Sequence, residues 1–266
     1  MRSLRDLSSL KGSVALVTGA GGHIGSAVAD GLAELGADLI LLDRDSASIG
    51  SVADAIHKKY EVHVAELQVD LEYLGDVDIL SEVRGFAPVL DVLVNCAAFV
   101  GTDKLEGWNE PFEGQSVATW RRALEVNLTA PFQLVQSLLP LLSKSSGASV
   151  VNFLSIYGIC APDYAIYEGL DMNNPAAYAA SKAGLLQLTR WLATTLAPKI
   201  RVNAITPGGV ERGQPDSFIE RYTAKTPLRR MAREEDMKGA VAYLASNLSR
   251  YVTGQNIVID GGWSVW

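Results

Sequence analysis

The stretch that decides the fold is VALVTGAGGHIGSAVADGLAELGADLILLDRD, residues 14–45. Its apolar run at 14–19 is typical of a buried strand, residues 26–36 have the pattern of a helix that ends at a glycine, and residues 37–45 form a second apolar run. Glycines at 19, 21, 22 and 25 let the backbone approach a ligand closely. In open α/β sheets a diphosphate binds at such a turn, against the N-terminus of the following helix. The stretch therefore predicts a nucleotide-binding strand–turn–helix unit.

The rest of the chain repeats this alternation of strands and helices. Further strands are predicted at residues 61–71, 89–98, 148–155, 200–209 and 254–262, and further helices at 46–60, 116–142 and 176–197. The strand runs are continuously apolar, which indicates a parallel sheet buried on both faces. Neither a linker nor an internal repeat divides the chain. We therefore predict an α/β fold: one domain over residues 1–266, with a polar lead at 1–11 and a doubly wound parallel sheet (Rossmann fold) of about seven strands covered by helices on both faces.

Composition and charge exclude several classes of protein. Of the 266 residues 48% are hydrophobic, and the net charge of −7 disfavours nucleic acid and anionic membrane surfaces as partners. No apolar run approaches the roughly 18 to 20 residues that span a bilayer, and the N-terminus lacks the apolar core of a secretion signal. The two cysteines, Cys96 and Cys160, favour a reducing compartment. We predict a cytoplasmic protein with no membrane or nucleic-acid partner.

An acidic residue near the end of the second predicted strand bears on the choice of nucleotide. Asp43 lies 18 positions after Gly25, where a carboxylate can accept hydrogen bonds from both ribose hydroxyls and would repel a 2′-phosphate. This favours NAD over NADP as the cofactor. Arg44 leaves two alternatives open, because a guanidinium can stack on adenine or bind a phosphate.

Five motifs spread along the chain together resemble the classical short-chain dehydrogenase/reductase family. They are Thr18-Gly19-x-x-x-His23-Ile24-Gly25, Asn95–Ala98 (NCAA), Asn127, Ser155 and Tyr178-x-x-x-Lys182, and the resemblance runs from about Lys11 to the end of the chain. His23 stands where the family has the middle glycine of its loop. A histidine adopts left-handed backbone geometry more readily than a β-branched residue, so we expect an altered loop that still binds the nucleotide. We predict no metal site, because neither His23 nor the other two histidines, His57 and His63, have ligand spacing.

The resemblance implies a set of cofactor-binding residues near the ends of the predicted strands. They are Gly19, Gly22, His23, Ile24, Asp43, Arg44, Asp70, Leu71, Asn95, Ala97, Tyr178, Lys182, Pro207, Gly209 and Val210. The family commonly has a threonine a few residues after the proline, whereas this chain has Glu211 and Arg212 in that segment. The contacts at the nicotinamide end are therefore expected to depart from the family pattern.

Hydride transfer requires a group that exchanges a proton with the substrate oxygen. Tyr178 and Lys182 lie four residues apart on a predicted helix, so their side chains share one face. A tyrosine with a pKa of about 10 is a poor base at neutral pH, but a nearby ammonium and the positive ring of an oxidised nicotinamide favour its phenolate. The resemblance implies that Ser155 holds the substrate oxygen and that Asn127 supports a water leading protons to the lysine. Asn127, Ser155, Tyr178 and Lys182 are the predicted catalytic residues.

The segment between the predicted catalytic serine and tyrosine is longer than the family usually shows. It places Tyr164, Tyr167 and Glu168 at the expected lip of the cleft, where they can hydrogen-bond a polyhydroxylated substrate. The alternative is a surface excursion or a subunit contact. Residues 213–231, charged and bounded by prolines, are predicted to be a substrate lid or, alternatively, a plain pair of surface helices.

Residues 155–210 most resemble enzymes of flagellin-glycan and sialic-acid-like sugar biosynthesis. We therefore predict an NAD(H)-dependent oxidoreductase that interconverts an alcohol and a ketone or aldehyde on a small polar, sugar-derived substrate. A 3-oxoacyl-acyl-carrier-protein reductase using NADPH is the first alternative. Asp43 disfavours it, as does the presence of only one charged residue, Lys144, where such family members look basic for the acidic carrier. A non-catalytic nucleotide-sensing module is the second alternative, and it would have a broken Ser-Tyr-Lys set.

The family is usually dimeric or tetrameric, which implies a homodimer or homotetramer. Leucines at helical spacing in the two long predicted helices suit either subunit packing or an intrachain core. They are Leu134, Leu138, Leu142, Leu185, Leu188 and Leu192.

Overall fold

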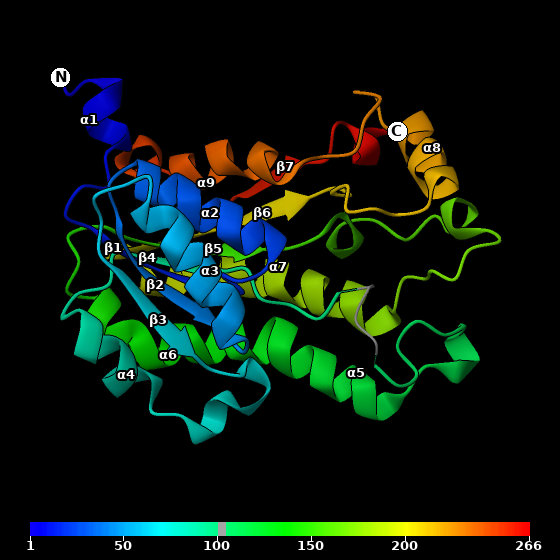
Figure 1. Ribbon diagram of the computed structural model, residues 1–266, viewed down its shortest axis with the longest axis horizontal. Coiled ribbons are helices and arrows are strands. Elements are labelled where there is room, and N and C mark those ends of the chain that lie inside the picture. Colours follow the sequence, from blue (N-terminus) through cyan, green and yellow to red (C-terminus); the bar gives the residue numbers. More distant parts are fainter. Residues whose placement is uncertain (101–104) are drawn as a thin grey trace.

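The molecule is built round a sheet of seven parallel strands (Figure 1). The computed structural model covers residues 1–266 and describes residues 1–100 and 105–266. The strands stand in the order β3-β2-β1-β4-β5-β6-β7, so the chain starts inside the sheet, runs to one edge and returns beside β1. A ligand of such a sheet binds where the order reverses, between β1 and β4. The strands are β1 Val14–Thr18, β2 Asp38–Asp43, β3 Val64–Gln68, β4 Val92–Asn95, β5 Ala148–Phe153, β6 Ile200–Pro207 and β7 Asn256–Ile259.

Helices cover both faces of the sheet (Figure 1). On one face lie α2 (His23–Glu34), α3 (Ser46–His57) and α9 (Lys238–Ala245); on the other lie α4 (Ile79–Phe86), α5 (Val117–Leu124), α6 (Ala130–Leu142) and α7 (Ala176–Leu196). The helices α1 (Leu4–Ser8) and α8 (Asp216–Lys225) lie toward opposite ends of the molecule. The predicted doubly wound α/β fold is confirmed.

Successive side chains of each central strand enter two different cores. In β1, Leu16 packs into the core under α4, α6 and α7, whereas Ala15 and Val17 pack into the core under α2, α3 and α9. Because successive residues of a strand point to opposite faces, a strand covered on both sides must be apolar throughout. This is why these strands have continuous apolar runs in the sequence.

Several elements differ from the sequence prediction. The polar lead contains α1, whose N-terminus is closed by Ser3 and Asp6 in a reciprocal capping box, and neither α4 nor α9 was predicted. The long helix expected over 116–142 is interrupted by a turn of π-helix, Glu125–Thr129, between α5 and α6. Residues 213–231 contain one helix, α8, rather than a pair.

The six leucines at helical spacing lie in the intrachain core. Five are buried, and Leu188 is partly buried against the same apolar clusters. They are therefore not available for subunit packing, and the predicted oligomer needs other surfaces. In the part of the chain that the structure describes, no helix is both long enough and apolar enough to cross a membrane.

Candidate active site

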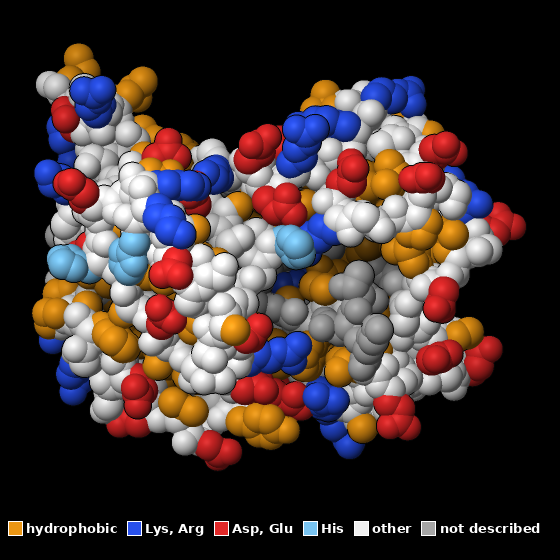
Figure 2. Space-filling model, in the orientation of Figure 1, with side chains coloured by type: hydrophobic (Ala, Val, Ile, Leu, Met, Phe, Trp, Pro, Cys, Tyr) orange, Lys and Arg blue, Asp and Glu red, His pale blue; other side chains and the backbone are white. Residues whose placement is uncertain are grey.

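A cleft of about 330 Å³ opens where the strand order reverses. Figure 2 shows the surface hollowed near the middle of this face, with charged side chains of both signs gathered round the hollow. The cleft is lined by most of the residues predicted to hold a cofactor: Gly19, Gly22, His23, Ile24, Asp43, Arg44, Asp70, Leu71, Ala97, Tyr178, Lys182 and Pro207.

Three of the predicted cofactor residues do not line this cleft. Asn95 is buried, and its amide donates a hydrogen bond of 2.8 Å to Asn152 Oδ1, which ties β4 to β5. The Gly209 amide donates to the Tyr222 hydroxyl at 2.6 Å, beside a smaller cavity. Val210 is buried and bridges to Ala232.

The glycine turn is close-packed, which explains why it needs glycines. Gly19 has a φ of +66°, in the left-handed region, and a Cβ there would come within 2.8 Å of the Ala97 backbone. A Cβ on Gly25 would lie 1.9 Å from the Gly19 carbonyl oxygen. The turn delivers the chain directly to the N-terminus of α2, whose first amides have no partner within the helix. The residues present therefore fit the diphosphate of a dinucleotide.

His23 does not have the left-handed backbone that the sequence suggested. It is the first residue of the right-handed helix α2, and among the described residues only Arg229 is a non-glycine with positive φ. The turn is made at Gly19, so the position of His23 accepts any ordinary side chain. The imidazole is 68% exposed, and its Nδ1 lies 3.8 Å from Glu234 Oε1.

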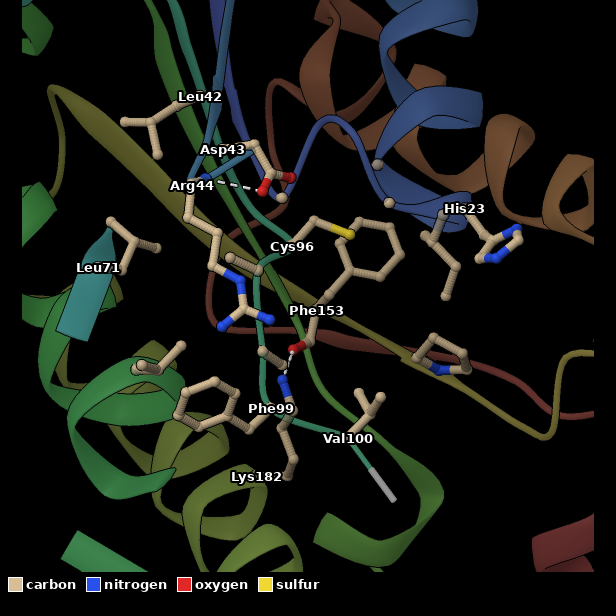
Figure 3. Close-up of a pocket in the computed structure, with 18 of the residues that line it drawn as sticks. His23, Leu42, Asp43, Arg44, Leu71, Cys96, Phe99, Val100, Phe153 and Lys182 are labelled. Atoms are coloured by element: carbon tan, nitrogen blue, oxygen red, sulfur yellow. Dashed lines mark hydrogen bonds between the residues drawn. The ribbon is translucent and has the colours of Figure 1, made fainter. Parts of the chain in front are cut away.

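Asp43 and Arg44 point in different directions at the end of β2 (Figure 3). Asp43 Oδ2 accepts a hydrogen bond of 3.0 Å from the Gly21 amide, and Oδ1 accepts one of 2.8 Å from the Arg44 amide. The carboxylate therefore lies against the glycine turn. The Arg44 guanidinium lies instead over the Phe99 ring, 5.7 Å from its centroid.

The predicted catalytic tyrosine and lysine meet beside Ser155. Both lie near the start of α7, and the Lys182 ammonium, 2% exposed, donates a hydrogen bond of 2.9 Å to the Phe153 carbonyl. Burial lowers the pKa of Lys182 to about 8. Burial raises the pKa of the Tyr178 hydroxyl, while its hydrogen bond with Ser155 and the charge of Arg212 act in the opposite direction.

Asn127 lies in the π-helical turn between α5 and α6. Its Oδ1 accepts a 2.8 Å hydrogen bond from the Phe99 amide, and its Nδ2 donates at 3.1 Å both to the Phe99 carbonyl and to Ser181 Oγ. The side chain is fully buried and joins the segment after β4 to α7. It therefore positions the cleft wall, and its role toward a proton-carrying water stays a prediction.

The three residues predicted to touch substrate do not line the 330 Å³ cleft. Tyr164 is 59% exposed, Glu168 is exposed, and the Tyr167 hydroxyl forms a short hydrogen bond with the Tyr157 hydroxyl. Tyr167 also packs on Phe218 of α8, with ring centroids 5.5 Å apart. The long segment therefore forms a wall with α8.

Some residues of the site carried no clear signal in the sequence. Phe99 lines the cleft but lies just outside the motif Asn95–Ala98, and Cys96 lines it from inside that motif, where only its neighbours were expected to touch the cofactor. Burial raises the pKa of the Cys96 thiol to about 12, so this cysteine is not a ready nucleophile. Arg212 also lines the cleft, and its only signal was the absence of the family's threonine. Within residues 1–100 and 105–266, no three His, Cys, Asp or Glu side chains gather as a metal site would require.

Comparison with known proteins agrees with this geometry. The family model described as enoyl-(acyl carrier protein) reductase matches residues 19–264. A short-chain dehydrogenase of Leptospira borgpetersenii with bound NAD⁺ superposes with a TM-score of 0.82 and 32% identity, covering 99% of this chain and 96% of that one. The chain is a short-chain dehydrogenase/reductase. The predicted resemblance is confirmed, and as a member of this family the protein is an oxidoreductase that binds NAD or NADP.

Other relatives of this short-chain dehydrogenase/reductase are named for different substrates or roles. A 3-oxoacyl-[acyl-carrier-protein] reductase of Aquifex aeolicus is 31% identical over 95% of this chain and 98% of its own length. A galactitol 2-dehydrogenase of Cereibacter sphaeroides is 31% identical over 98% and 99% of the two chains. A flagellin modification protein of Campylobacter coli is 27% identical over 96% and 100%.

A further solved structure bears on both cofactor and substrate. A gluconate 5-dehydrogenase of Burkholderia cenocepacia, in complex with NADP and tartrate, superposes with a TM-score of 0.86 and 25% identity over 99% of this chain and 100% of that one. Relatives of the same fold thus carry either nicotinamide cofactor, and the family alone does not separate NAD from NADP. The alternative of a non-catalytic sensing module has no support among these proteins.

Proposed function

We propose that the enzyme interconverts an alcohol and a carbonyl group on a small polar, sugar-derived substrate, with NAD(H) as its preferred cofactor. The observation that carries the cofactor proposal is the Asp43 carboxylate, which lies at the end of β2 against the glycine turn. A carboxylate at this place can accept hydrogen bonds from ribose hydroxyls, whereas the 2′-phosphate of NADP would meet a like charge.

The opposing argument for NADP rests on Arg44. Its guanidinium lies over the Phe99 ring, and among the described residues it forms no ion pair with Asp43. Arg44 therefore leaves the charge of Asp43 uncompensated, and its planar group is placed to stack rather than to cancel that charge. This supports NAD.

The chemistry follows from the three side chains beside the cleft. A nicotinamide cofactor held by the glycine turn, Asp43 and Lys182 would supply the hydride acceptor for oxidation and the hydride donor for reduction. In oxidation Tyr178 takes the hydroxyl proton of the substrate, and in reduction it gives that proton back to the carbonyl oxygen. Ser155, hydrogen-bonded to Tyr178, stabilises the developing alkoxide. The buried Lys182 ammonium favours the phenolate form of Tyr178 by its charge.

The substrate proposal is supported by polar groups in the wall that the long segment between Ser155 and Tyr178 forms with α8. Asn174 is buried, and in the part of the chain that the structure describes its Oδ1 has no hydrogen-bond partner. The same side chain hydrogen-bonds Tyr167, whose hydroxyl meets Tyr157. Hydroxyl and amide groups of this kind suit a polyhydroxylated substrate. Relatives that act on galactitol and gluconate, and one named for flagellin modification, are consistent with this class.

A 3-oxoacyl-acyl-carrier-protein reductase is the second candidate, because a relative of that activity matches over nearly the full chain. A carrier protein is acidic and needs a basic docking surface. Before β5 this chain offers only Lys144, whose ammonium donates to the Pro88 carbonyl at 3.3 Å. This local charge favours the sugar-derived substrate.

The cofactor proposal is tested by titrating NADH and NADPH separately into the wild type, Asp43→Ala and the exposed-carboxylate control Asp54→Ala. We expect the wild type and the control to bind NADH more tightly than NADPH. Asp43→Ala should bind NADPH roughly tenfold more tightly than the wild type does, as loss of a like-charge contact predicts. Tighter binding of NADPH by the wild type would contradict the role of Asp43.

The substrate proposal needs its own assay. Oxidation of polyols and sugar acids, followed as NADH formation, is compared with reduction of an acetoacetyl thioester. We expect turnover of a polyhydroxylated compound. Turnover of the thioester alone would favour the carrier-protein alternative. The predicted homodimer or homotetramer and cytoplasmic location also stay proposals, and sedimentation velocity measures the first of them.

A further inference from the structure

Three charged or titratable side chains meet at the rim of the cleft. His23 comes from the first turn of α2, Arg212 from the segment after β6, and Glu234 from the short helical turn Glu234–Met237. Arg212 Nε lies 3.5 Å and His23 Nδ1 lies 3.8 Å from the same atom, Glu234 Oε1. His23 and Arg212 line the cleft, whereas Glu234 does not. The two basic side chains thus face the ligand space with the carboxylate beside them.

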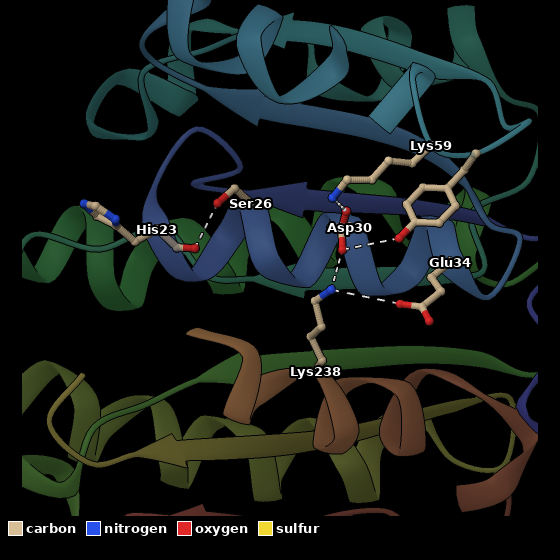
Figure 4. A network of polar contacts seen from close by, with 7 residues as sticks. His23, Ser26, Asp30, Glu34, Lys59 and Lys238 are labelled. Carbon is tan, nitrogen blue, oxygen red and sulfur yellow. Dashed lines mark hydrogen bonds and ion pairs between the residues drawn. The ribbon is translucent and has the colours of Figure 1, made fainter. Parts of the chain in front are cut away.

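The elements that carry this cluster are held together (Figure 4). Asp30 of α2 accepts hydrogen bonds from Lys59 and from Lys238, the first residue of α9, and the Ser26 hydroxyl donates to the His23 carbonyl. Because α9 follows directly on the turn that bears Glu234, the ion pair of Asp30 with Lys238 anchors that turn against α2. The spacing of His23 and Glu234 is therefore built into the fold.

The Arg212 guanidinium has N–H donors that are available to a ligand. Its backbone is fixed by a 2.6 Å hydrogen bond from the Arg212 amide to Gln214 Oε1, and Gln214 in turn donates to the Val210 carbonyl at 2.9 Å. Within residues 1–100 and 105–266, the guanidinium has only the 3.5 Å pairing of Nε with Glu234, so its two terminal nitrogens have no acceptor. Such a fork suits two oxygens of a phosphate or carboxylate.

The charge of Arg212 acts on two groups that line the cleft. Burial is the main influence on the Tyr178 and Cys96 pKa values and raises both, but Arg212 acts to lower each of them. Arg212 therefore lies within electrostatic range of the reacting hydroxyl and of the strand end beside the glycine turn. A dinucleotide diphosphate bound at the N-terminus of α2 would also lie within the range of this charge.

We propose that Arg212, with His23 beside it, binds the diphosphate of the nicotinamide cofactor and exchanges its loose pairing with Glu234 for that anion. The pairing is long and partly exposed, and such ion pairs contribute little to stability, so a ligand phosphate replaces it readily. In the family pattern a threonine in this segment offers a single hydroxyl. Here a guanidinium supplies charge as well as two parallel donors. The proposal does not depend on whether NAD or NADP is preferred.

The first experiment measures ADP-ribose, which carries the diphosphate without the nicotinamide, by calorimetry. Arg212→Gln is compared with the wild type and with Arg250→Gln, an exposed arginine away from the cleft. We expect Arg212→Gln to weaken ADP-ribose and NADH by about 10- to 100-fold, in the range for hydrogen bonds to charged groups, and the control to leave both unchanged. Arg212→Lys should fall between, because it keeps the charge and loses the fork.

A second arm separates the two anions that an arginine here could bind. Tartrate is titrated into the NADH-loaded wild type and Arg212→Gln. Weaker tartrate binding with unchanged ADP-ribose binding would overturn the proposal and assign Arg212 to a substrate carboxylate. Unchanged binding of both ligands would overturn it as well.

The proposed exchange of Glu234 for the diphosphate is tested by a substitution that should tighten binding instead of weakening it. Glu234→Gln removes the competing carboxylate, so we expect ADP-ribose to bind about two- to fivefold more tightly, as loss of a neighbouring like charge predicts. His23→Gln should weaken ADP-ribose by no more than a similar factor, because the imidazole is largely exposed. Weaker binding by Glu234→Gln would show that the carboxylate is needed to hold Arg212, and would overturn the exchange.

Discussion

The cofactor side and the proposed substrate side of the site are built in different ways. On the cofactor side the chain backbone forms the surface: Gly19 and Gly25 allow contacts that any Cβ would block, and Thr18 of β1 stands in register with Asn95 of β4. On the proposed substrate side, beyond the residues that line the 330 Å³ cleft, side chains from separate segments form an aromatic wall. Its rings are in contact one after another, with successive centroids between 5.5 and 5.9 Å apart; they are Tyr167, Phe218, Tyr222 and Trp263.

The two constructions suit two kinds of recognition: that of the dinucleotide part common to many ligands, and that of a particular substrate. A backbone cradle binds the part of the ligand that all dinucleotides share, and it tolerates little change. A side-chain wall keeps its shape by packing and can change residue by residue, so it suits the part of the site that selects a substrate. Substitutions on the two sides should therefore affect different measured constants.

The largest effect is expected where the two sides meet. Tyr178→Phe removes the hydroxyl that we propose exchanges the proton and keeps the ring, so we expect kcat to fall by about 10²- to 10⁴-fold. NADH binding, followed by nicotinamide fluorescence, should be nearly unchanged, because the backbone cradle is intact. Substantial turnover by this variant would exclude Tyr178 as the general acid/base.

On the cofactor side, Gly25→Ala is expected to weaken NADH binding by at least about 100-fold, since the new Cβ would lie 1.9 Å from the Gly19 carbonyl oxygen and force the turn open. Gly85→Ala in α4 is the matched control, because a Cβ there meets nothing within 4 Å. Circular dichroism shows whether the Gly25 variant still folds. Normal NADH affinity in a folded Gly25→Ala would contradict the backbone cradle.

Removing the buried charge of Lys182 should make the protein more stable. The pKa of Lys182 is lowered from an ordinary 10.5 to about 8 in the folded protein. Below about pH 8 the folded state therefore bears the full free-energy cost of a buried ammonium. This cost decreases as the pH rises from 8 toward 10.5, because the folded state then loses the proton. Lys182→Met removes the charge but leaves the Phe153 carbonyl without its donor. We expect the free energy of unfolding at pH 7 to rise by about 2 kcal/mol.

Denaturant unfolding at pH 7 and pH 10 measures this effect. The gain of Lys182→Met over the wild type should shrink at the higher pH, while activity is lost at both. A less stable variant at pH 7 would show that the ammonium is a net stabilising group.

The smallest effect is expected in the aromatic wall. Tyr167→Phe removes the hydroxyl that meets Tyr157 and should raise the KM of the substrate by about two- to fivefold, the range for one neutral hydrogen bond. Tyr164→Phe, on an exposed ring, is the control and should change nothing. If Tyr167→Phe altered NADH affinity instead of KM, the cofactor side and the proposed substrate side of the site would not be separable.

Much of the cofactor side could be predicted from the sequence because its signals are local. A buried strand, a glycine turn and a helix start follow one another within residues 14–34, and Asp43 comes at the end of the next strand. Tyr178 and Lys182 are neighbours on one helix face, so their spacing alone places them together. Asn95 and Gly209 were expected from the family resemblance, and their contacts are with Asn152 and Tyr222, which lie 57 and 13 positions further along the chain.

The substrate side was less predictable. Tyr164, Tyr167 and Glu168 were expected to face a ligand, yet packing against α8 turns Tyr167 toward Phe218 and leaves Tyr164 exposed. Local patterns state which residues are polar, but they do not state which neighbour satisfies each hydrogen bond. That depends on where separate segments are brought by the sheet.

The sequence by itself determined the succession of the seven strands along the chain, the two-sided burial of the sheet and the Tyr-Lys pair, because periodicity and spacing depend on residues close together in the chain. Only the tertiary structure decided that the leucine stripes form an intrachain core, that His23 begins α2, and that Glu234 lies between His23 and Arg212. These contacts join distant parts of the chain. Their distances follow from how β1, β6 and α9 pack, which no local pattern records.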